Sequence, residues 1–161
     1  MPTSTDGLIA GATIVHAGRL LLIRHATPEG APLWTLPSGK ADPGESAADA
    51  AAREALEEAG VVVAPLVVLG SRVHPVSAWR VVYVACRLLS GEAYAASRRE
   101  VAEVRWVATE ELDGFVPGGL YPPVRAYFDG FAGCPWTRGE THSSAPPSKP
   151  GARPATAYHR W

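Results

Sequence analysis

The sequence has few cysteines and little that is typical of a secreted protein. Cys86 and Cys134 are the only two, they lie far apart, and the first lies in an apolar run. Small secreted domains held together by disulfides use more cysteines, so this scarcity argues against such a scaffold and favours free thiols in a reducing compartment. Asp6 and the absence of a basic start before the first apolar run are unlike a secretory signal. We therefore expect a cytoplasmic protein.

The sequence also lacks a charge excess and long hydrophobic runs. Its net charge is −1 at pH 7, so no overall field attracts nucleic acid or an anionic membrane. The longest apolar stretches are far too short to span a bilayer. We therefore expect no nucleic-acid partner and no membrane partner. The 161 residues, 47% of them hydrophobic, suit one domain with a real core.

Composition changes near residue 133, and we divide the chain there into a domain over residues 1–132 and a tail over residues 133–161. The tail has five prolines and few aliphatic residues, and its four basic residues against one glutamate give it a charge of +3. This composition is typical of a disordered segment. Trp136, Tyr158 and Trp161 leave docking on the domain or on a second subunit as the alternative, so a homodimer stays open.

The domain alternates strand-like and helix-like segments. We expect a hairpin of residues 8–15 and 19–24 around His16-Ala17-Gly18, then a loop over residues 25–35. A first helix is expected between residues 46 and 60. Two further helical segments are expected after it, at 109–112 with Thr109 as N-cap and at 121–131. The remaining expected strands are 34–36, 61–69, 80–89 and 101–107, with a turn-rich stretch at 71–78. This order predicts an α/β/α sandwich around a mixed β-sheet.

The most informative segment is an acidic helix. Ser46 is a candidate N-cap and Gly60 a candidate stop. Glu54, Glu57 and Glu58 share one face, where like charges cost about 0.2–0.5 kcal/mol per pair, and no basic residue follows them at a spacing of four. A divalent cation would offset this repulsion, and an ordinary solvated acidic helix is the alternative. We expect the opposite face to pack on the core; it carries Ala48, Ala52, Ala55, Leu56 and Ala59.

Residues 39–61 resemble the Nudix box, the signature of the MutT-like Nudix hydrolases. The box reads Gly, five residues, Glu, seven residues, Arg-Glu, an apolar residue, any residue, Glu-Glu, any residue, Gly and an apolar residue. Two positions depart from the family: Ala55 is smaller than the usual aliphatic residue, and Ser38 stands where a second glycine is common. The seven glycine and polar positions all match: Gly39, Glu45, Arg53, Glu54, Glu57, Glu58 and Gly60.

Carboxylates without nearby His or Cys ligands favour a hard cation, hence Mg²⁺ with Mn²⁺ as a substitute. We expect Glu57 and Glu58 to be ligands, and Glu54 to be a further ligand or a base acting through water. Glu45 would contribute through water from the loop, and Arg53 would hold a carboxylate in place. The resemblance implies the same fold, and a metal contact from the backbone carbonyl of Ser38.

The resemblance also implies a further glutamate from the region of Glu100 and Glu103. We take Glu103 as the candidate catalytic residue, with plain surface charge as the alternative. The substrate-binding residues are harder to assign, because aromatic residues beside strands often serve packing and a lone loop lysine is often solvated. His74 and Trp79 are further candidates for a wall of the substrate site. The candidate set is Arg24, Trp34, Gly39, Lys40 and Tyr83.

The function that these residues and the resemblance imply is Mg²⁺-dependent hydrolysis of a diphosphate linkage in a nucleotide, by attack of water on phosphorus. Two alternatives stay open: a Nudix-like domain that senses nucleotides without hydrolysing them, and a hydrolase of a non-nucleotide diphosphate metabolite. The sequence shows neither an adenosine-specific nor an oxidised-guanine-specific signature.

Overall fold

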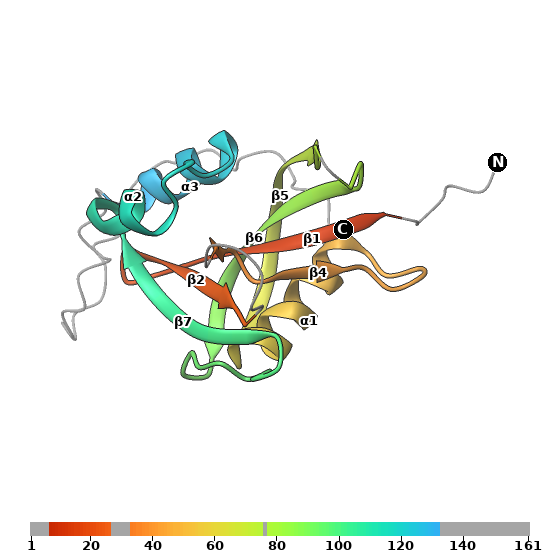
Figure 1. Ribbon diagram of the computed structural model, residues 1–161, viewed down its shortest axis with the longest axis horizontal. Coiled ribbons are helices and arrows are strands. Elements are labelled where there is room, and N and C mark those ends of the chain that lie inside the picture. Colours follow the sequence, from red (N-terminus) through yellow and green to blue (C-terminus); the bar gives the residue numbers. More distant parts are fainter. Residues whose placement is uncertain (1–6, 27–32, 76, 133–161) are drawn as a thin grey trace, which may run out of the picture.

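The computed structural model describes residues 7–26, 33–75 and 77–132. Within these residues, seven strands, a 3₁₀ turn and three helices follow one another (Figure 1). Their bounds are β1 (Leu8–His16), β2 (Arg19–His25), β3 (Trp34–Thr35), β4 (Ser38–Lys40), α1 (Ala47–Ala59), β5 (Val62–Val73), β6 (Arg80–Ser90), β7 (Val101–Ala108), η1 (Thr109–Glu111), α2 (Leu112–Phe115) and α3 (Pro122–Ala132).

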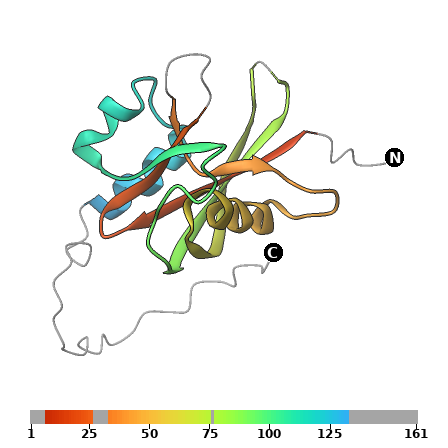
Figure 2. The same ribbon diagram turned by 60° about the horizontal axis from the view of Figure 1, so that its bottom comes forward.

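The strands form a mixed sheet, as expected. Strand β1 runs parallel to β6 and antiparallel to β2 and β4. Strand β5 pairs with β6 in an antiparallel hairpin, while β2 pairs with both β3 and β7. The pairing of β1 with β2 is confined to Val15↔Leu20 and His16↔Arg19, beside the turn. The two halves of the sheet therefore diverge away from that turn, with β2 and β7 on one side and the β5–β6 hairpin on the other (Figure 2).

Both faces of the sheet are covered, which confirms the sandwich. Helix α1 lies on one side of the strands, and α2 and α3 lie on the other (Figure 1). Because side chains alternate along a strand, β2 sends Leu21 and Ile23 into the α1 core, and Leu20 and Leu22 into the core under α3. Val124 and Phe128 of α3 are fully buried. None of the described helices has the length and apolar character needed to cross a membrane.

The ends of α1 are as the sequence predicts. Ser46 Oγ accepts a hydrogen bond from the backbone N–H of Asp49 at 3.0 Å. Gly60 adopts φ 68°, a left-handed conformation in which its N–H reaches the carbonyls of Ala55 and Leu56. Local capping chemistry therefore fixes both boundaries of the helix that carries the acidic residues.

The prediction for the faces of α1 is partly wrong. Ala55 and Ala59 are buried as expected, but Leu56 is 51% exposed. The buried face carries Ala50 and Ala51 together with two of the glutamates, Glu54 and Glu58. The small alanines let the helix backbone approach the sheet closely, and this approach carries two carboxylates inward with it.

Smaller corrections concern element boundaries. Strand β5 extends to Val73, into the stretch expected to be turns, and Ser38–Lys40 forms an additional strand. Thr109 is not an N-cap: the cap position belongs to Ala108, whose N–H donates to the Glu111 carboxylate at 3.0 Å. The predicted loop partly, and the predicted tail entirely, lie outside the described residues, as does Cys134. Cys86 is buried and free, as expected.

Candidate active site

Arg53 is the centre of the acidic segment. Its guanidinium donates twice to Glu45, both at 2.9 Å, and also to Glu54 at 2.8 Å and to Glu57 at 3.1 Å. A further hydrogen bond of 2.8 Å reaches the backbone carbonyl of Lys40. The arginine therefore ties the helix to the loop and strand that precede it, and it orients three carboxylates, as the sequence predicted for one of them.

Glu54 and Glu58 are the two buried acids of the site, with residue exposures of 8% and 4%. Glu58 accepts a hydrogen bond from the Ser38 N–H at 2.9 Å. Gly39 faces Glu54 so closely that a Cβ atom there would overlap the carboxylate. The glycine of the motif is thus needed to make room for a glutamate side chain.

Burial makes both acids hard to ionise. The pKa of Glu58 is raised to about 8, chiefly by loss of solvent; the Ser38 hydrogen bond opposes this shift, and the nearby charges of Glu54, Glu100 and Glu57 add to it. The pKa of Glu54 is also raised, chiefly by burial, although Arg53 opposes the shift. In contrast, hydrogen bonds from Arg53 and from the Asp42 N–H lower the pKa of Glu45.

The acids suit a hard cation in their chemistry. Across residues 7–26, 33–75 and 77–132, no three His, Cys, Asp or Glu side chains stand together as a ready-made metal cage. Mg²⁺ does not need such a cage, because it commonly binds through one or two carboxylates and completes its shell with water and substrate phosphates. Glu54 and Glu58 supply two oxygen donors in a place where burial disfavours uncompensated negative charge, so the residues present fit the ion.

The two downstream glutamates occupy different surroundings. Glu103 on β7 pairs with Arg24 at 3.2 Å and with Arg105 at 2.6 Å, and hydrogen bonds from Arg105 and Arg24 lower its pKa. Glu100 instead lies close enough to Glu54 and Glu58 for its charge to raise the pKa of both. Of these two, Glu100 is therefore the carboxylate whose charge acts on the acidic site.

A cavity of about 310 Å³ opens where the two halves of the sheet diverge, on the side covered by α3. This volume is at the lower end of the range for small-molecule sites. Its described lining combines aromatic and aliphatic walls with a few polar groups. Prominent among them are His25, Trp34, Leu36, Arg72, Tyr83 and Tyr121.

The polar wall of the cavity is organised around two tyrosines. The rings of Tyr83 and Tyr121 stack with centroids 4.7 Å apart. Arg72 donates from Nε to the Tyr83 hydroxyl at 2.9 Å, and its guanidinium carbon lies 5.7 and 5.8 Å from the Tyr83 and Tyr121 ring centres. Tyr121 in turn donates to the Ser71 carbonyl at 3.1 Å. Strand β5, strand β6 and the start of α3 are thereby joined at the cavity wall.

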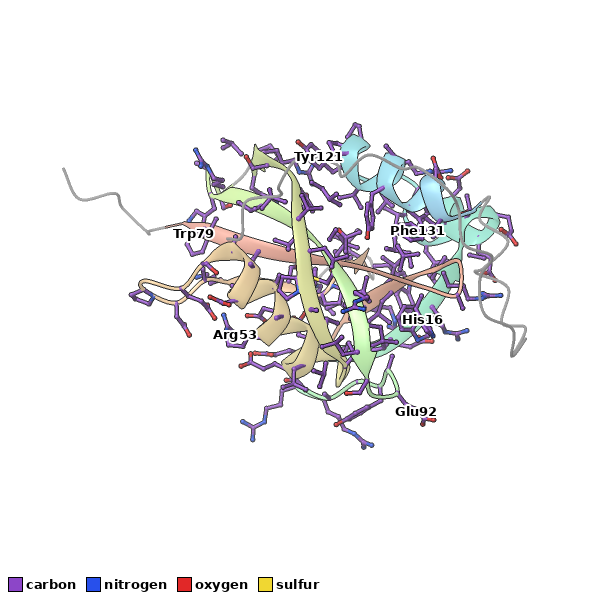
Figure 3. The ribbon with its side chains drawn as sticks, turned by 180° about the vertical axis from the view of Figure 1, so that it is seen from behind. His16, Arg53, Trp79, Glu92, Tyr121 and Phe131 are labelled. Carbon is purple, nitrogen blue, oxygen red and sulfur yellow. The ribbon has the colours of Figure 1, made fainter. Side chains whose placement is uncertain are left out.

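Strand β4 connects the cavity to the acidic site. Ser38 lines the cavity, while its N–H binds Glu58. The next residue, Gly39, faces Glu54 on the other side of the strand. Figure 3 shows Tyr121 at the start of α3 and Arg53 on α1, on opposite sides of β1. A molecule that reaches from the cavity around β4 would therefore meet the acidic residues.

The structure brings together only part of the predicted substrate site. Trp34, Tyr83 and His74 line the cavity. Arg24 pairs with Glu103, and Lys40 lies 4.1 Å above the Trp79 ring, away from the cavity lining. Sequence reasoning missed Arg72 and Tyr121, because neither stands in a motif and only strand pairing and the docking of α3 place them beside Tyr83.

Comparison with known proteins agrees with this architecture. The NUDIX domain model matches residues 7–128. A Bacillus subtilis (strain 168) protein described as "Putative 8-oxo-dGTP diphosphatase" is 38% identical over 85 residues, which cover 53% of this chain and 56% of that protein. A Mycobacterium tuberculosis (strain CDC 1551 / Oshkosh) protein described as "Putative 8-oxo-dGTP diphosphatase 2" is 37% identical over 114 residues, covering 65% of this chain and 74% of that one.

The fold comparison gives the same result. The crystal structure of a NUDIX hydrolase from Nitrosomonas europaea superposes with a TM-score of 0.66 at 24% identity, covering 76% of this chain and 70% of that chain. The arrangement of strands and helices described above is thus shared with a solved structure.

Proposed function

The chain belongs to the NUDIX domain family, and from this premise we propose that it is a Mg²⁺-dependent pyrophosphohydrolase that cleaves a diphosphate linkage in a nucleotide. Water attacks phosphorus, and Mn²⁺ substitutes for Mg²⁺. The observation that carries the proposal is the pair of buried glutamates on α1, with Gly39 and the Ser38 N–H shaped around them. The relatives described as 8-oxo-dGTP diphosphatases make purine nucleoside triphosphates the first substrates to test.

Glu54 and Glu58 would hold the ion, with the exposed Glu57 beside them as a further ligand. When bound, Mg²⁺ screens the charge of the diphosphate and lowers the pKa of a coordinated water. Arg53 keeps Glu54 and Glu57 oriented through its hydrogen bonds. Glu45 acts mainly through Arg53, because both of its carboxylate oxygens accept hydrogen bonds from that guanidinium.

We favour Glu100 over Glu103 as the additional acid of the reaction. Glu103 is neutralised by two arginines, whereas the Glu100 charge acts on Glu54 and Glu58. The hydrogen bonds from Arg105 and Arg24 lower the pKa of Glu103, which makes Glu103 a weak base. We also propose a cytoplasmic location, which the scarcity of cysteine supports.

The test compares wild type with Glu58→Gln, and uses Glu92→Gln as the matched control. Glu92 is exposed and lies far from Arg53 (Figure 3). We expect Glu58→Gln to lower the release of phosphate or pyrophosphate from nucleoside triphosphates by about 100-fold or more, since general acid–base and metal contributions are of this size. Its melting temperature at pH 7 should rise, because burial raises the pKa of Glu58 and folding must therefore protonate it, whereas the neutral amide avoids this cost and still accepts the Ser38 hydrogen bond.

A second measurement does not depend on turnover. Mg²⁺ should raise the melting temperature of wild type and of Glu92→Gln, and leave that of Glu58→Gln unchanged. Equal turnover in wild type and Glu58→Gln, or a Mg²⁺ response that survives the substitution, would contradict the proposed site.

A further inference from the structure

Arg72 presents a guanidinium at the cavity that is fixed in orientation but not fully engaged in hydrogen bonds. It lies on β5 opposite Val81 and is exposed at the cavity mouth. Its Nε is fixed to the Tyr83 hydroxyl. Within the part of the chain that the structure describes, its two terminal nitrogens form no hydrogen bond or ion pair. The guanidinium is therefore held in one orientation by two rings, while its remaining donors are available to a ligand.

The aromatic support of Arg72 is itself well fixed. Tyr83 is 8% exposed, and the Tyr121 hydroxyl is held by the Ser71 carbonyl. Gly70 makes room for that hydroxyl, since a Cβ atom there would lie 2.8 Å from it. A guanidinium that is positioned in advance loses less conformational entropy when it binds, so each hydrogen bond that it makes adds more to affinity.

The cavity lacks several of the side chains that commonly recognise nucleobases. The sequence contains no Asn and no Gln, and the described lining contains no Asp and no Glu. Adenine is commonly read by Asn or Gln, and the cytosine amino group by Glu or Asp. The polar side chains that remain in the described lining are hydroxyls, imidazoles, the Trp34 indole and Arg72. The strongest of these donors is the arginine fork, and it pairs best with two adjacent acceptors.

We propose that Arg72 is a specificity-determining residue of this cavity and selects a base with two adjacent hydrogen-bond acceptors. Guanine presents such a pair at O6 and N7, and cytosine presents one at O2 and N3. Adenine and thymine present none. Oxidation of guanine at C8 places a hydrogen on N7 and removes the pair, so the Arg72 fork favours ordinary guanine over 8-oxoguanine. The inference rests on the proposed function, and it adds that the cavity receives the nucleoside of the substrate.

This preference separates the chain from what the names of its relatives suggest. A site built for 8-oxoguanine needs an acceptor for the N7 hydrogen, whereas Arg72 supplies only donors. Each bidentate contact between arginine and a matching base edge discriminates by about 1–3 kcal/mol, which is roughly a 5- to 150-fold difference in affinity.

The experiment measures binding of nucleoside monophosphates by calorimetry, because monophosphates contain no diphosphate to be cleaved. The full-length protein is titrated with dGMP, 8-oxo-dGMP, dCMP, dAMP and dTMP. The variants are Arg72→Met, which keeps the length of the side chain without its donors, and Arg72→Lys, which keeps the charge without the fork. Arg125→Met is the matched control, because Arg125 lies on α3 and pairs with Asp129.

We expect wild type and Arg125→Met to bind dGMP and dCMP about tenfold or more tightly than the other three. Arg72→Met should remove this difference by weakening dGMP and dCMP alone, and Arg72→Lys should not restore it. Tighter binding of 8-oxo-dGMP than of dGMP by wild type would overturn the inference. An equal loss for all five ligands would also overturn it, since Arg72 would then contact the phosphate.

The same panel, supplied as triphosphates with Mg²⁺, distinguishes this inference from the proposed function. Selective binding without hydrolysis of any triphosphate would refute the hydrolase and uphold the role of Arg72. Hydrolysis that Arg72→Met slows equally for every base would uphold the hydrolase and refute the selectivity.

Discussion

Replacing Gly39 with alanine should disable the acidic site and leave the protein folded. Gly39 lies in β4 and does not have a positive φ, so its backbone conformation is open to alanine. The added methyl group would overlap the carboxylate of Glu54, whose more distant oxygen, Oε2, is only 2.7 Å away. Because an ordinary contact to Cβ is at least 3.4 Å, the whole carboxylate has to retreat.

The size of the effect follows from this displacement. Glu54 is held by Arg53 at 2.8 Å and is packed between helix and strand, so it cannot move without losing its place in the site. A displacement of about 1 Å in a catalytic group costs roughly 100-fold in rate, or about 2.7 kcal/mol. Stability should change by about 1 kcal/mol at most, which is a shift of about 2–4 °C in melting temperature for a chain of this size.

The assay is phosphate or pyrophosphate release from nucleoside triphosphates in the presence of Mg²⁺, together with a thermal melt. Gly130→Ala is the control, because a Cβ at Gly130 in α3 meets nothing within 4 Å; it should keep full activity. In a Glu54→Ala background, Gly39→Ala should have no further effect on turnover, since the group that it displaces is already gone. Gly39→Ala with nearly normal turnover would refute the reasoning, as would an equal loss in both backgrounds.

Two further predictions concern stability. Gly60→Ala and Gly44→Ala both place alanine at positive φ, 68° and 80°, so each should lower the free energy of unfolding by about 1–2 kcal/mol in urea titrations. Gly60→Ala should cost more than Gly44→Ala, because its methyl group also overlaps the Tyr94 ring. In a Tyr94→Ala background, this difference between the two substitutions should disappear. Burial raises the pKa of the Cys86 thiol to about 12, so unfolding releases its proton above about pH 8.5 and stability should fall by about 2 kcal/mol between pH 8 and 10. Urea titrations at both pH values in a Cys134→Ser background would measure this loss, and an equal decline after Cys86→Ala would contradict its assignment to this thiol.

The sequence predicted features that depend on local chemistry. Ser46 and Gly60 cap α1 as expected because a hydroxyl at the N-cap and a glycine at the stop act on their own neighbourhood. Every described strand except Ser38–Lys40 was predicted, although several boundaries differ. The predicted N-cap at Thr109 is wrong by one position. The cap is Ala108, whose N–H donates a hydrogen bond to the Glu111 carboxylate. This error arises because a threonine hydroxyl and a nearby glutamate carboxylate can both cap the start of a helical turn.

Features that depend on tertiary contact could not be predicted in the same way. The cavity needs β1 and β2 to diverge and Tyr121 to dock beside Tyr83, and neither event leaves a local pattern. Similarly, Glu100 and Glu103 are equivalent in the sequence. Only the pairing of β7 with β2 places Glu103 opposite Arg24, and thereby separates the two acids.

The burial of two acids on α1 is not what the stability of the fold alone would favour. Hydrophobicity alone would put Leu56 inward and the glutamates outward, but Leu56 is half exposed and Glu54 and Glu58 are buried. Among the described residues, no Lys, Arg or His forms an ion pair with Glu58, which has only the Ser38 N–H as its partner. A buried carboxylate among like charges destabilises the fold, so stability alone would favour an apolar side chain at this position. A bound divalent cation would reverse that preference. Two measurements on Glu58→Gln would test this: its stability without metal should exceed that of wild type, and its stability should not respond to Mg²⁺. The first measures what the carboxylate costs the fold, and the second measures what the ion restores.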